Sequence, residues 1–213
     1  MFQYVPDYIN KIKNPVNILH IGANYGQETE SYINNYSDTL KSITYIECIP
    51  SVFEKLVIYN KQFENRMNIK YINALCSDKD HMEVEFYVTN NNGLSSSVFK
   101  PNLDNWQWSD VNVNTSILLK TITINKLIED NILFDNYDTL IIDTQGSELK
   151  ILKGADKILK NVKQCICEYS SVEYYKGGAM LNDLIDIFTT NNFIIDTIDK
   201  NNSHGDIYCY KLN

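Results

Sequence analysis

Short apolar runs of strand length recur along this chain, and segments with a helical spacing of apolar residues lie between most of them. The runs occupy residues 16–21, 43–46, 69–74, 139–142 and 162–167. The helical patterns occupy residues 27–36, 51–62 and 147–159. This alternation is typical of βαβ units, whose parallel strands are covered by helices on both faces. We therefore predict an α/β fold built on a mostly parallel sheet.

The C-terminal part departs from this alternation. Residues 181–190 have a helical pattern, and two extended runs follow at 193–198 and 207–212. The connection between these runs, KNNSHGD, is rich in the Asn and Gly residues that form tight turns between antiparallel strands. The sequence thus predicts that an antiparallel hairpin closes the parallel sheet.

A long polar segment at residues 89–116 interrupts the pattern of short connections. It follows an alternating apolar and polar run at 82–88 and precedes a strand-like run at 117–124. Segments longer than about 12 to 15 residues without structure of their own are usually functional or disordered. No internal repeat or change of composition indicates a domain boundary, so we predict a single domain over residues 1–213 in which this loop has a functional role.

Charge and hydropathy exclude several classes of protein. With 19 Lys and Arg against 27 Asp and Glu, the net charge of -8 disfavours a surface that follows nucleic-acid phosphates. No stretch approaches the roughly 20 apolar residues of a membrane span, and the first residues lack the pattern of a signal peptide. We therefore expect a cytoplasmic protein that binds neither nucleic acid nor membrane.

The five cysteines are odd in number, scattered and mostly placed within apolar runs. They are Cys48, Cys76, Cys165, Cys167 and Cys209. Since they lack the paired CxxC or HxxxH spacing of a zinc site, they predict buried free thiols.

The first apolar run leads directly into IGANYGQE, which places two glycines between a strand and a helix. Glycine there lets the backbone approach a ligand and adopt dihedral angles that a Cβ forbids. The spacing of Gly22 and Gly26 differs from the G-x-G-x-x-G loop that holds a pyrophosphate, so it favours a ligand without phosphate. Glu47 ends the second strand, where a carboxylate can accept hydrogen bonds from ribose hydroxyls. These features together predict an adenosine-type cofactor, although such turns are common in α/β proteins and a strand-end Glu is often only solvated.

Acidic residues end the later strands at the same predicted edge of the sheet. Asp143 follows the fourth run and Glu168 the fifth. Ligands of open α/β sheets bind at this edge, and carboxylates that line a cleft favour a cationic ligand such as a sulfonium. At the third run, Asp78 or the backbone of residues 73–76 could face an adenine amino group. Asp78 and Asp143 could equally cap the turn or helix that follows each of them.

These strand ends carry the residues by which the sequence resembles the FkbM family of S-adenosylmethionine-dependent methyltransferases. The matching stretches, in the family's order, are IGANYGQE (21–28), IECIPSVFEKL (46–56), NALCSD (73–78), GLSSS (93–97), IIDTQGSELKILKGA (141–155) and CEYSS (167–171). The pattern DxxGxExxxLKGA is the most specific of them, and the serines after Gly93 come second. The resemblance covers most of residues 16–171.

The resemblance implies a Rossmann-like class I methyltransferase fold, with a seven-stranded, mostly parallel sheet, an antiparallel C-terminal strand and helices on both faces. It implies S-adenosylmethionine as the cofactor. It also implies that the enzyme methylates a hydroxyl oxygen of a saccharide or small metabolite, with the loop at 89–116 in the acceptor site. The identity of the acceptor and the oligomeric state stay open.

The resemblance also implies a set of site residues. The cofactor-binding set is His20, Gly22, Ala23, Asn24, Gly26, Glu28, Glu47, Cys48, Ala74, Leu75, Cys76, Asp143 and Gln145, and the acceptor-binding set is Ser95, Ser96, Glu148 and Tyr169. Within the first set, the Gly22 to Gly26 turn would line the methionine part, Glu47 would hold the ribose, and Ala74 and Cys76 would flank the adenine. His20 is a departure, because related motifs place Asp there. It is either part of the catalytic site or a neutral residue of the core.

Methyl transfer from a sulfonium is an in-line displacement, so the main task of the protein is to align the acceptor oxygen, the methyl carbon and the sulfur. A placed base that removes the acceptor proton adds typically about 10²- to 10⁴-fold in rate. We expect Asp143 to be this base, with Glu168 and His20 as the next candidates. Asp143 and Glu148 could instead hold a divalent cation, since hard cations take carboxylate oxygens, but their spacing is not diagnostic and we predict no metal.

Other interpretations stay open at this point. Two aromatic stretches, residues 106–108 and 169–175, could form a platform for the faces of a sugar or pack on the rim of the sheet. The chain could be a non-catalytic nucleoside-binding homologue, a nucleic-acid ribose methyltransferase, or an enzyme of nucleotide sugars or NAD. The negative net charge disfavours the nucleic-acid methyltransferase. The missing G-x-G-x-x-G pattern disfavours the enzyme of nucleotide sugars or NAD.

Overall fold

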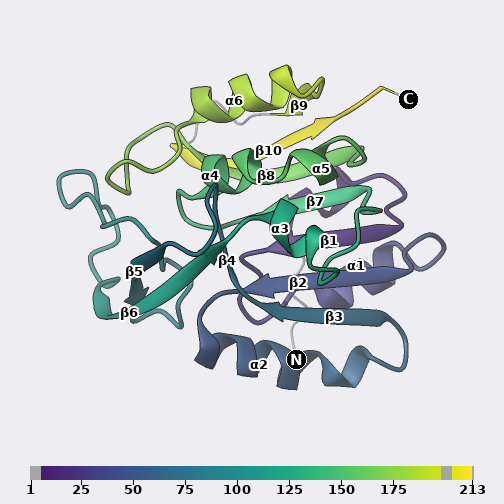
Figure 1. The fold of residues 1–213 in the computed structure, drawn as a ribbon, viewed down its shortest axis with the longest axis horizontal. Coiled ribbons are helices and arrows are strands. Elements are labelled where there is room, and N and C mark those ends of the chain that lie inside the picture. The colour runs from purple at the N-terminus through teal and green to yellow at the C-terminus, as the bar shows by residue number, and fades with distance from the viewer. Residues whose placement is uncertain (1–5, 198–202, 213) are drawn as a thin grey trace.

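The computed structural model describes residues 6–197 and 203–212, and in these a seven-stranded sheet lies between two layers of helices (Figure 1). The strand order is β3-β2-β1-β7-β8-β10-β9. The strands are β1 (Asn17–Ile21), β2 (Ser42–Glu47), β3 (Asn68–Asn73), β7 (Thr139–Ile142), β8 (Gln164–Ser170), β9 (Ile194–Thr197) and β10 (His204–Tyr210). Neighbours from β3 to β8 pair in parallel, whereas β10 is antiparallel to both β8 and β9. The predicted fold with its C-terminal hairpin is confirmed; residues 198–202 between the two strands lie outside the described residues.

The central strands are apolar on both faces because helices cover both. In β1, Ile18 packs into one hydrophobic cluster and Leu19 into the other, and neither side chain reaches solvent. In β7, Leu140 and Ile141 divide between the same two clusters. Successive side chains of a strand point to opposite faces, so an uninterrupted apolar run is what a doubly covered parallel sheet requires.

The helices divide between the two faces. One face is covered by the short turn η1 (Asp7–Asn10) with α1 (Thr29–Asn35) and α2 (Pro50–Asn60), which the turn η2 (Lys61–Phe63) extends. The other is covered by α3 (Ile124–Glu129), α4 (Glu148–Lys153), α5 (Asp156–Leu159) and α6 (Leu181–Thr190). The helix predicted at 27–36 begins only at Thr29, because the residues before it form the turn that follows β1.

The prediction of one continuous helix over residues 147–159 is wrong, because the chain breaks between α4 and α5. Gly154 ends α4, and its amide donates to the carbonyls of Lys150 and Ile151. A Cβ at this position would lie 2.2 Å from the carbonyl oxygen of Ser77. The glycine of the LKGA motif therefore lets the chain pass close to the segment that follows the third strand, and the helix ends there.

A second, three-stranded sheet stands beside the first, with the order β4-β6-β5 (Figure 1). It consists of β4 (Leu75–Cys76), β5 (Glu83–Thr89) and β6 (Val113–Ile122), and β5 pairs with β6 in antiparallel fashion. The strand predicted at 117–124 thus begins earlier, and the loop shortens to residues 90–112. This loop is fastened to the body by two isolated bridges, Tyr87 with Ser97 and Pro101 with Tyr175.

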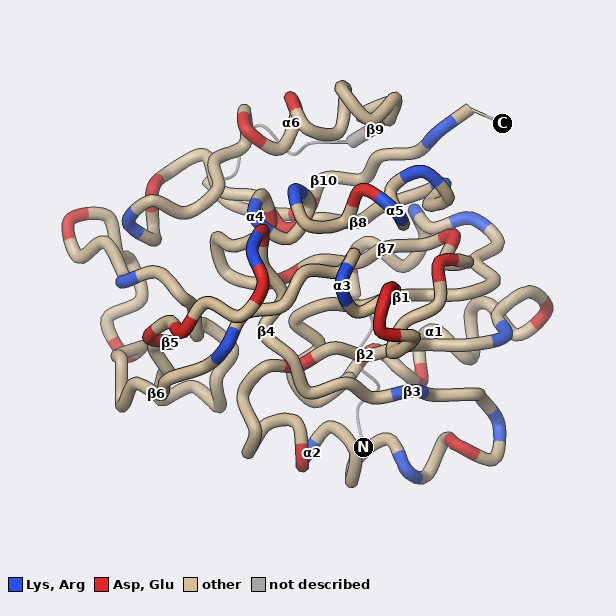
Figure 2. Tube along the Cα trace, viewed as in Figure 1, with Lys and Arg blue, Asp and Glu red and all other residues tan. Residues whose placement is uncertain are grey.

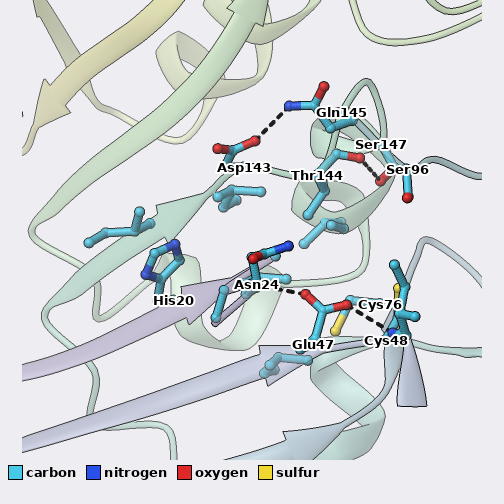
Figure 3. A pocket seen from close by; sticks show the side chains of 18 of the residues that line it. His20, Asn24, Glu47, Cys48, Cys76, Ser96, Asp143, Thr144, Gln145 and Ser147 are labelled. Carbon is cyan, nitrogen blue, oxygen red and sulfur yellow. Dashed lines mark hydrogen bonds between the residues drawn. The ribbon is translucent and has the colours of Figure 1, made fainter. Parts of the chain in front are cut away.

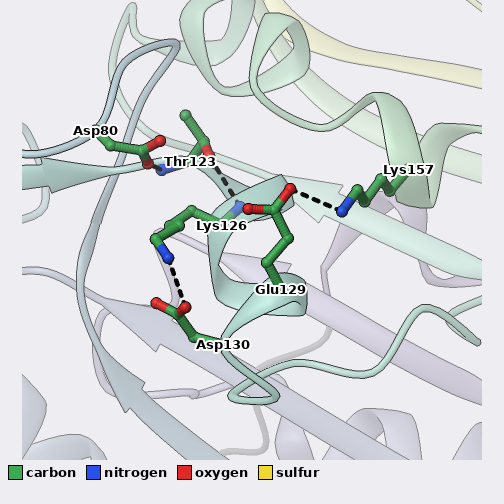
Figure 4. Close-up of polar contacts among 6 residues, drawn as sticks. All are labelled: Asp80, Thr123, Lys126, Glu129, Asp130 and Lys157. Atoms are coloured by element: carbon green, nitrogen blue, oxygen red, sulfur yellow. Dashed lines mark hydrogen bonds and ion pairs between the residues drawn. The ribbon is translucent and has the colours of Figure 1, made fainter.

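Charged pairs contribute little to holding this fold together. Both charge signs are scattered along the trace (Figure 2). Among the described residues, two ion pairs form, Lys126 with Asp130 at 2.6 Å and Lys157 with Glu129 at 2.8 Å. Both lie at α3, whose first turn is capped by Thr123 (Figure 4). They are partly exposed, so each is worth at most about 1 kcal/mol.

The cysteines are free thiols, as predicted, and all but the half-buried Cys48 are buried. No helix within the described residues is long and apolar enough to cross a membrane.

Candidate active site

The turn after β1 is shaped by close contact with the neighbouring strand. Gly22 has a φ of +80°, and a Cβ there would lie 1.8 Å from the carbonyl oxygen of Asp143. The amides of Gly22 and Ala23 both donate to the carbonyl of Ile46, at 2.9 and 3.1 Å. The turn is thus pinned to the ends of β2 and β7, and only glycine fits at its first position.

Glu47 at the end of β2 is buried and held by backbone amides. Its Oε2 accepts from the Asn24 amide at 3.0 Å, and its Oε1 accepts from the Ile49 amide at 2.8 Å. Burial raises the pKa of this carboxyl, and the amide hydrogen bonds oppose that rise. Figure 3 shows Asn24 and Glu47 on one side of a pocket and Asp143 and Gln145 on the other.

This pocket, the first cavity, opens at the carboxyl ends of the parallel strands. Of the predicted cofactor-binding residues, those that line it are His20, Gly22, Ala23, Asn24, Glu28, Glu47, Cys48, Ala74, Leu75, Cys76, Asp143 and Gln145. Gly26 is outside this lining. A Cβ on it would meet Asn60 and Leu56 of α2 at 2.6 and 2.9 Å, so this glycine serves the packing of the turn on that helix.

Several lining residues were missing from the sequence prediction, and Tyr8 and Asp206 are the two of them with an ionisable side chain. Tyr8 precedes the first strand, and Asp206 lies in β10. Asp206 pairs in register with Glu168 because β10 runs antiparallel to β8, which brings the start of β10 to the edge where the parallel strands end. No local motif marks either position, and only knowledge of the strand order could have indicated Asp206.

His20 lines the first cavity but is a neutral ring. Burial lowers its pKa to about 3, so the ring is neutral at neutral pH and accepts a proton only weakly. Its Nδ1 lies 3.4 Å from the Tyr32 hydroxyl, and the rings of Tyr32 and Tyr45 pack against it with centroids 6.2 and 5.7 Å away. This environment matches the second of the two interpretations of His20, a neutral residue of the core.

Asp143 and Glu168 form a pair of acids that one amide bridges. Gln145 Nε2 donates to Asp143 at 2.9 Å and to Glu168 at 2.7 Å. Gln145 is itself fixed by the Tyr175 hydroxyl, 2.8 Å from its Oε1. Asp143 is exposed to the cavity and Glu168 is half-buried; their removal from bulk water raises the pKa of both acids, and the charge of Asp143 raises that of Glu168 further. The pair therefore retains a proton at a pH where separate carboxylates would have lost theirs.

Glu148 has a structural task in the turn before α4. Its Oε1 accepts from the Thr144 amide at 2.8 Å, the Thr144 hydroxyl at 3.0 Å and the Gly146 amide at 3.2 Å. The side chain is buried, which raises its pKa to about 7. It thus holds the D-T-Q-G turn in place, and this explains its position in the DxxGxE motif.

A second cavity adjoins the first, and Leu94 and Gln145 line both. Its other lining residues are Ser95, Trp108, Gly146, Glu148, Glu168, Tyr169, Ser170, Tyr174, Tyr175, Ala179 and His204. Of the predicted acceptor residues, Ser95, Glu148 and Tyr169 lie here, whereas Ser96 lies at the first cavity. Tyr169 is almost fully buried and belongs to the main hydrophobic cluster.

An aromatic wall bounds the second cavity. The Trp108 ring packs against Tyr174 with centroids 4.9 Å apart and against His204 at 5.5 Å. The wall is fixed by hydrogen bonds from Gln107 Nε2 to the Tyr174 hydroxyl and from that hydroxyl to Ser203. The long loop and the C-terminal strand therefore meet at this cavity.

The model of the methyltransferase FkbM domain matches residues 20–201 of this chain. The chain belongs to the FkbM methyltransferase family. The predicted cofactor, S-adenosylmethionine, is the cofactor of this family. No curated protein matches the sequence of this FkbM methyltransferase.

Solved structures share its fold at low sequence identity. A methyltransferase FkbM from Methylobacillus flagellatus has a TM-score of 0.61 and 15% identity, over 93% of this chain and 44% of that one. This chain thus spans less than half of that protein. A ribosomal protein L11 methylase from Lactobacillus delbrueckii subsp. bulgaricus has a TM-score of 0.52 and 11% sequence identity, over 96% of this chain and 75% of that one. TrmK of M. capricolum, in complex with S-adenosylhomocysteine, has a TM-score of 0.50 and 12% sequence identity, over 97% of this chain and 69% of that one.

Proposed function

We propose that this chain transfers the methyl group of S-adenosylmethionine to a hydroxyl oxygen of a saccharide or small metabolite. The observation that carries the proposal is the position of the acid pair. Asp143 lines the first cavity, Glu168 lines the second, and Gln145 lines both and donates to both acids. A methyl donor in one cavity and a hydroxyl in the other would meet beside a carboxylate.

The residues of the first cavity fit the proposed cofactor. The apolar segment from Ala74 to Cys76 suits an adenine ring, and Glu47 offers carboxylate oxygens to a ribose. Toward the Gly22 turn and Asp143 the lining becomes acidic, as a positively charged ligand requires. When bound there, the cofactor supplies an electrophilic methyl group on a sulfonium sulfur.

The Asp143 and Glu168 pair is the proposed base. As the acceptor oxygen attacks, its proton passes to the carboxylate of the pair. Gln145 donates to both acids and so holds them in position for this transfer. Removal of bulk water from both carboxyls, together with the charge of Asp143 beside Glu168, explains how a carboxyl at this place can have a pKa above its usual range. His20 is left out of this role because it is buried and has no hydrogen-bond contact with the acid pair in the described structure.

The second cavity is the proposed acceptor site. Among the described residues that line it, aromatic rings and carboxyls occur and no Lys or Arg does. Aromatic rings suit the apolar face of a sugar, and carboxyls accept hydrogen bonds from its hydroxyls. An acceptor with a phosphate or carboxylate would enter this site without a cationic partner, so we expect uncharged or amino-bearing acceptors.

Methyl transfer to a panel of acceptors tests the proposed function. We expect S-adenosylhomocysteine to form with neutral glycosides or amino glycosides and not with the matched sugar phosphates or uronic acids. Trp108→Ala removes part of the aromatic wall and is expected to raise the acceptor KM by about tenfold, with an unchanged affinity for S-adenosylhomocysteine. Preference for the phosphorylated sugars, or for RNA, would contradict the proposal.

The pH profile of turnover reports on the acid pair. The base must be ionised, and its pKa is raised, so turnover should fall on the acidic side at a higher pH than an ordinary carboxylate would allow. The measurement is kcat at saturating cofactor and acceptor from weakly acidic to weakly alkaline pH. A profile that is flat down to the usual range of Asp and Glu would rule out the pair as the base.

A further inference from the structure

An acidic side chain with an unsatisfied oxygen lines the first cavity at the start of α1. Glu28 Oε2 is shielded from solvent and accepts no hydrogen bond within the described part of the chain. The neighbouring Gln27, which also lines the cavity, has an unpaired buried Oε1. Both atoms are acceptors, and no donor among the described residues reaches either of them. A buried acceptor without a donor costs about 1 to 3 kcal/mol, and more when it is charged.

The groups that surround Glu28 supply no positive charge. The charge of Glu28 helps to raise the pKa of Tyr8, Tyr32 and Tyr45. The negative charge of Asp143 repels that of Glu28. Burial and Asp143 together raise its pKa to about 7. The described residues that line the first cavity include no Lys or Arg, and the His20 ring is neutral. A cation for Glu28 would therefore come from the ligand.

The position of Glu28 indicates which part of the proposed cofactor lies beside it. Glu28 lines the first cavity together with the Gly22 turn and is absent from the lining of the second. The sulfonium must face the second cavity, beside Gln145, for transfer to occur. The amino-acid arm of the cofactor extends away from the sulfur and from the adenine, and its ammonium group carries three N–H donors.

We propose that Glu28 binds the α-ammonium group of the methionine part of S-adenosylmethionine, and that Gln27 Oε1 accepts a second hydrogen bond from the same group. This inference rests on the proposed function. Glu28 supplies the charge, and Asp206, which also lines this cavity, is the rival acid.

Calorimetry with two uncharged-sulfur ligands tests the role of Glu28. S-adenosylhomocysteine and 5′-methylthioadenosine share the nucleoside and the thioether, and only the first has the ammonium-bearing arm. In Glu28→Gln we expect S-adenosylhomocysteine to bind about tenfold or more weaker, because a charge-assisted hydrogen bond is lost, and methylthioadenosine to bind within about twofold of the unchanged protein. Glu30→Gln, on the same helix and outside the cavity lining, is the matched control and should change neither affinity.

Each other result counts against the role of Glu28. Equal losses for the two ligands would show general damage to the cavity, and undiminished binding of S-adenosylhomocysteine would show that Glu28 does not hold the ammonium. An arm-specific loss in Asp206→Asn but not in Glu28→Gln would assign the role to Asp206. If the unchanged protein binds neither ligand, the proposed function fails as well. Should Glu28→Gln fold poorly, the unchanged protein must still prefer S-adenosylhomocysteine to its analogue without the amino group.

Discussion

Replacing Asp143 by Asn is expected to reduce turnover by about 10²- to 10⁴-fold, the usual contribution of a placed base. The amide keeps the shape of the carboxyl and can still accept from Gln145 Nε2, but it cannot take up the acceptor proton. Affinity for S-adenosylhomocysteine, whose sulfur is uncharged, should change little, since Glu47 and the Gly22 turn are untouched. The measurement is single-turnover methyl transfer together with calorimetry of S-adenosylhomocysteine.

The companion variant Glu168→Gln tests whether Asp143 and Glu168 act together as the base or Asp143 acts alone. Because Gln145 binds both acids and the charge of Asp143 raises the pKa of Glu168, the double variant should lose little more than the worse of the two single variants. Turnover within a few-fold of normal in Asp143→Asn would show that Asp143 is not the base.

Replacing Gly22 by Ala is the second change with a large expected effect. The added Cβ would lie 1.8 Å from the carbonyl oxygen of Asp143, at a φ of +80° that L side chains rarely adopt. The turn has to move away from β7, so we expect cofactor binding to be lost and the free energy of unfolding to fall by about 2 to 4 kcal/mol. Denaturant unfolding and calorimetry measure the two effects.

Gly177→Ala is the matched control for this change. Gly177 has nearly the same φ, +79°, but its nearest neighbour atom would lie 3.8 Å from an added Cβ. This variant carries only the backbone strain, which costs about 1 kcal/mol, and should keep its cofactor. If Gly22→Ala behaves like Gly177→Ala, the close contact between the turn and Asp143 does not shape the site.

The first cavity could be predicted from the sequence because its residues follow strands that are easily recognised. The run of apolar residues that ends at Ile21, followed at once by Gly22, indicates a strand end at a ligand, and parallel strands bring such ends to one edge. Asp143 and Glu168 follow from the same rule. The fold is predictable for a related reason, since a doubly covered sheet needs apolar strands with helices between them.

The second cavity could not be predicted in the same way. It is made where the loop at 90–112 meets residues from β8 and β10, and loop residues such as Trp108 have no periodicity that indicates their partners. The break at Gly154 was missed because helical spacing continues across it, and the cause is a contact with Ser77, 77 residues earlier in the chain. The unpaired oxygen of Glu28 likewise depends on packing from η1, α1 and β2, which only the structure shows.

Calorimetry of S-adenosylhomocysteine with the unchanged protein tests the central claim most directly, because it needs no knowledge of the acceptor. We expect saturable binding at one site per chain, abolished in Gly22→Ala and weakened in Glu47→Ala, because the Glu47 side chain lines the cavity and accepts from the Asn24 amide. Absence of binding of both S-adenosylhomocysteine and S-adenosylmethionine at millimolar concentration would contradict the account.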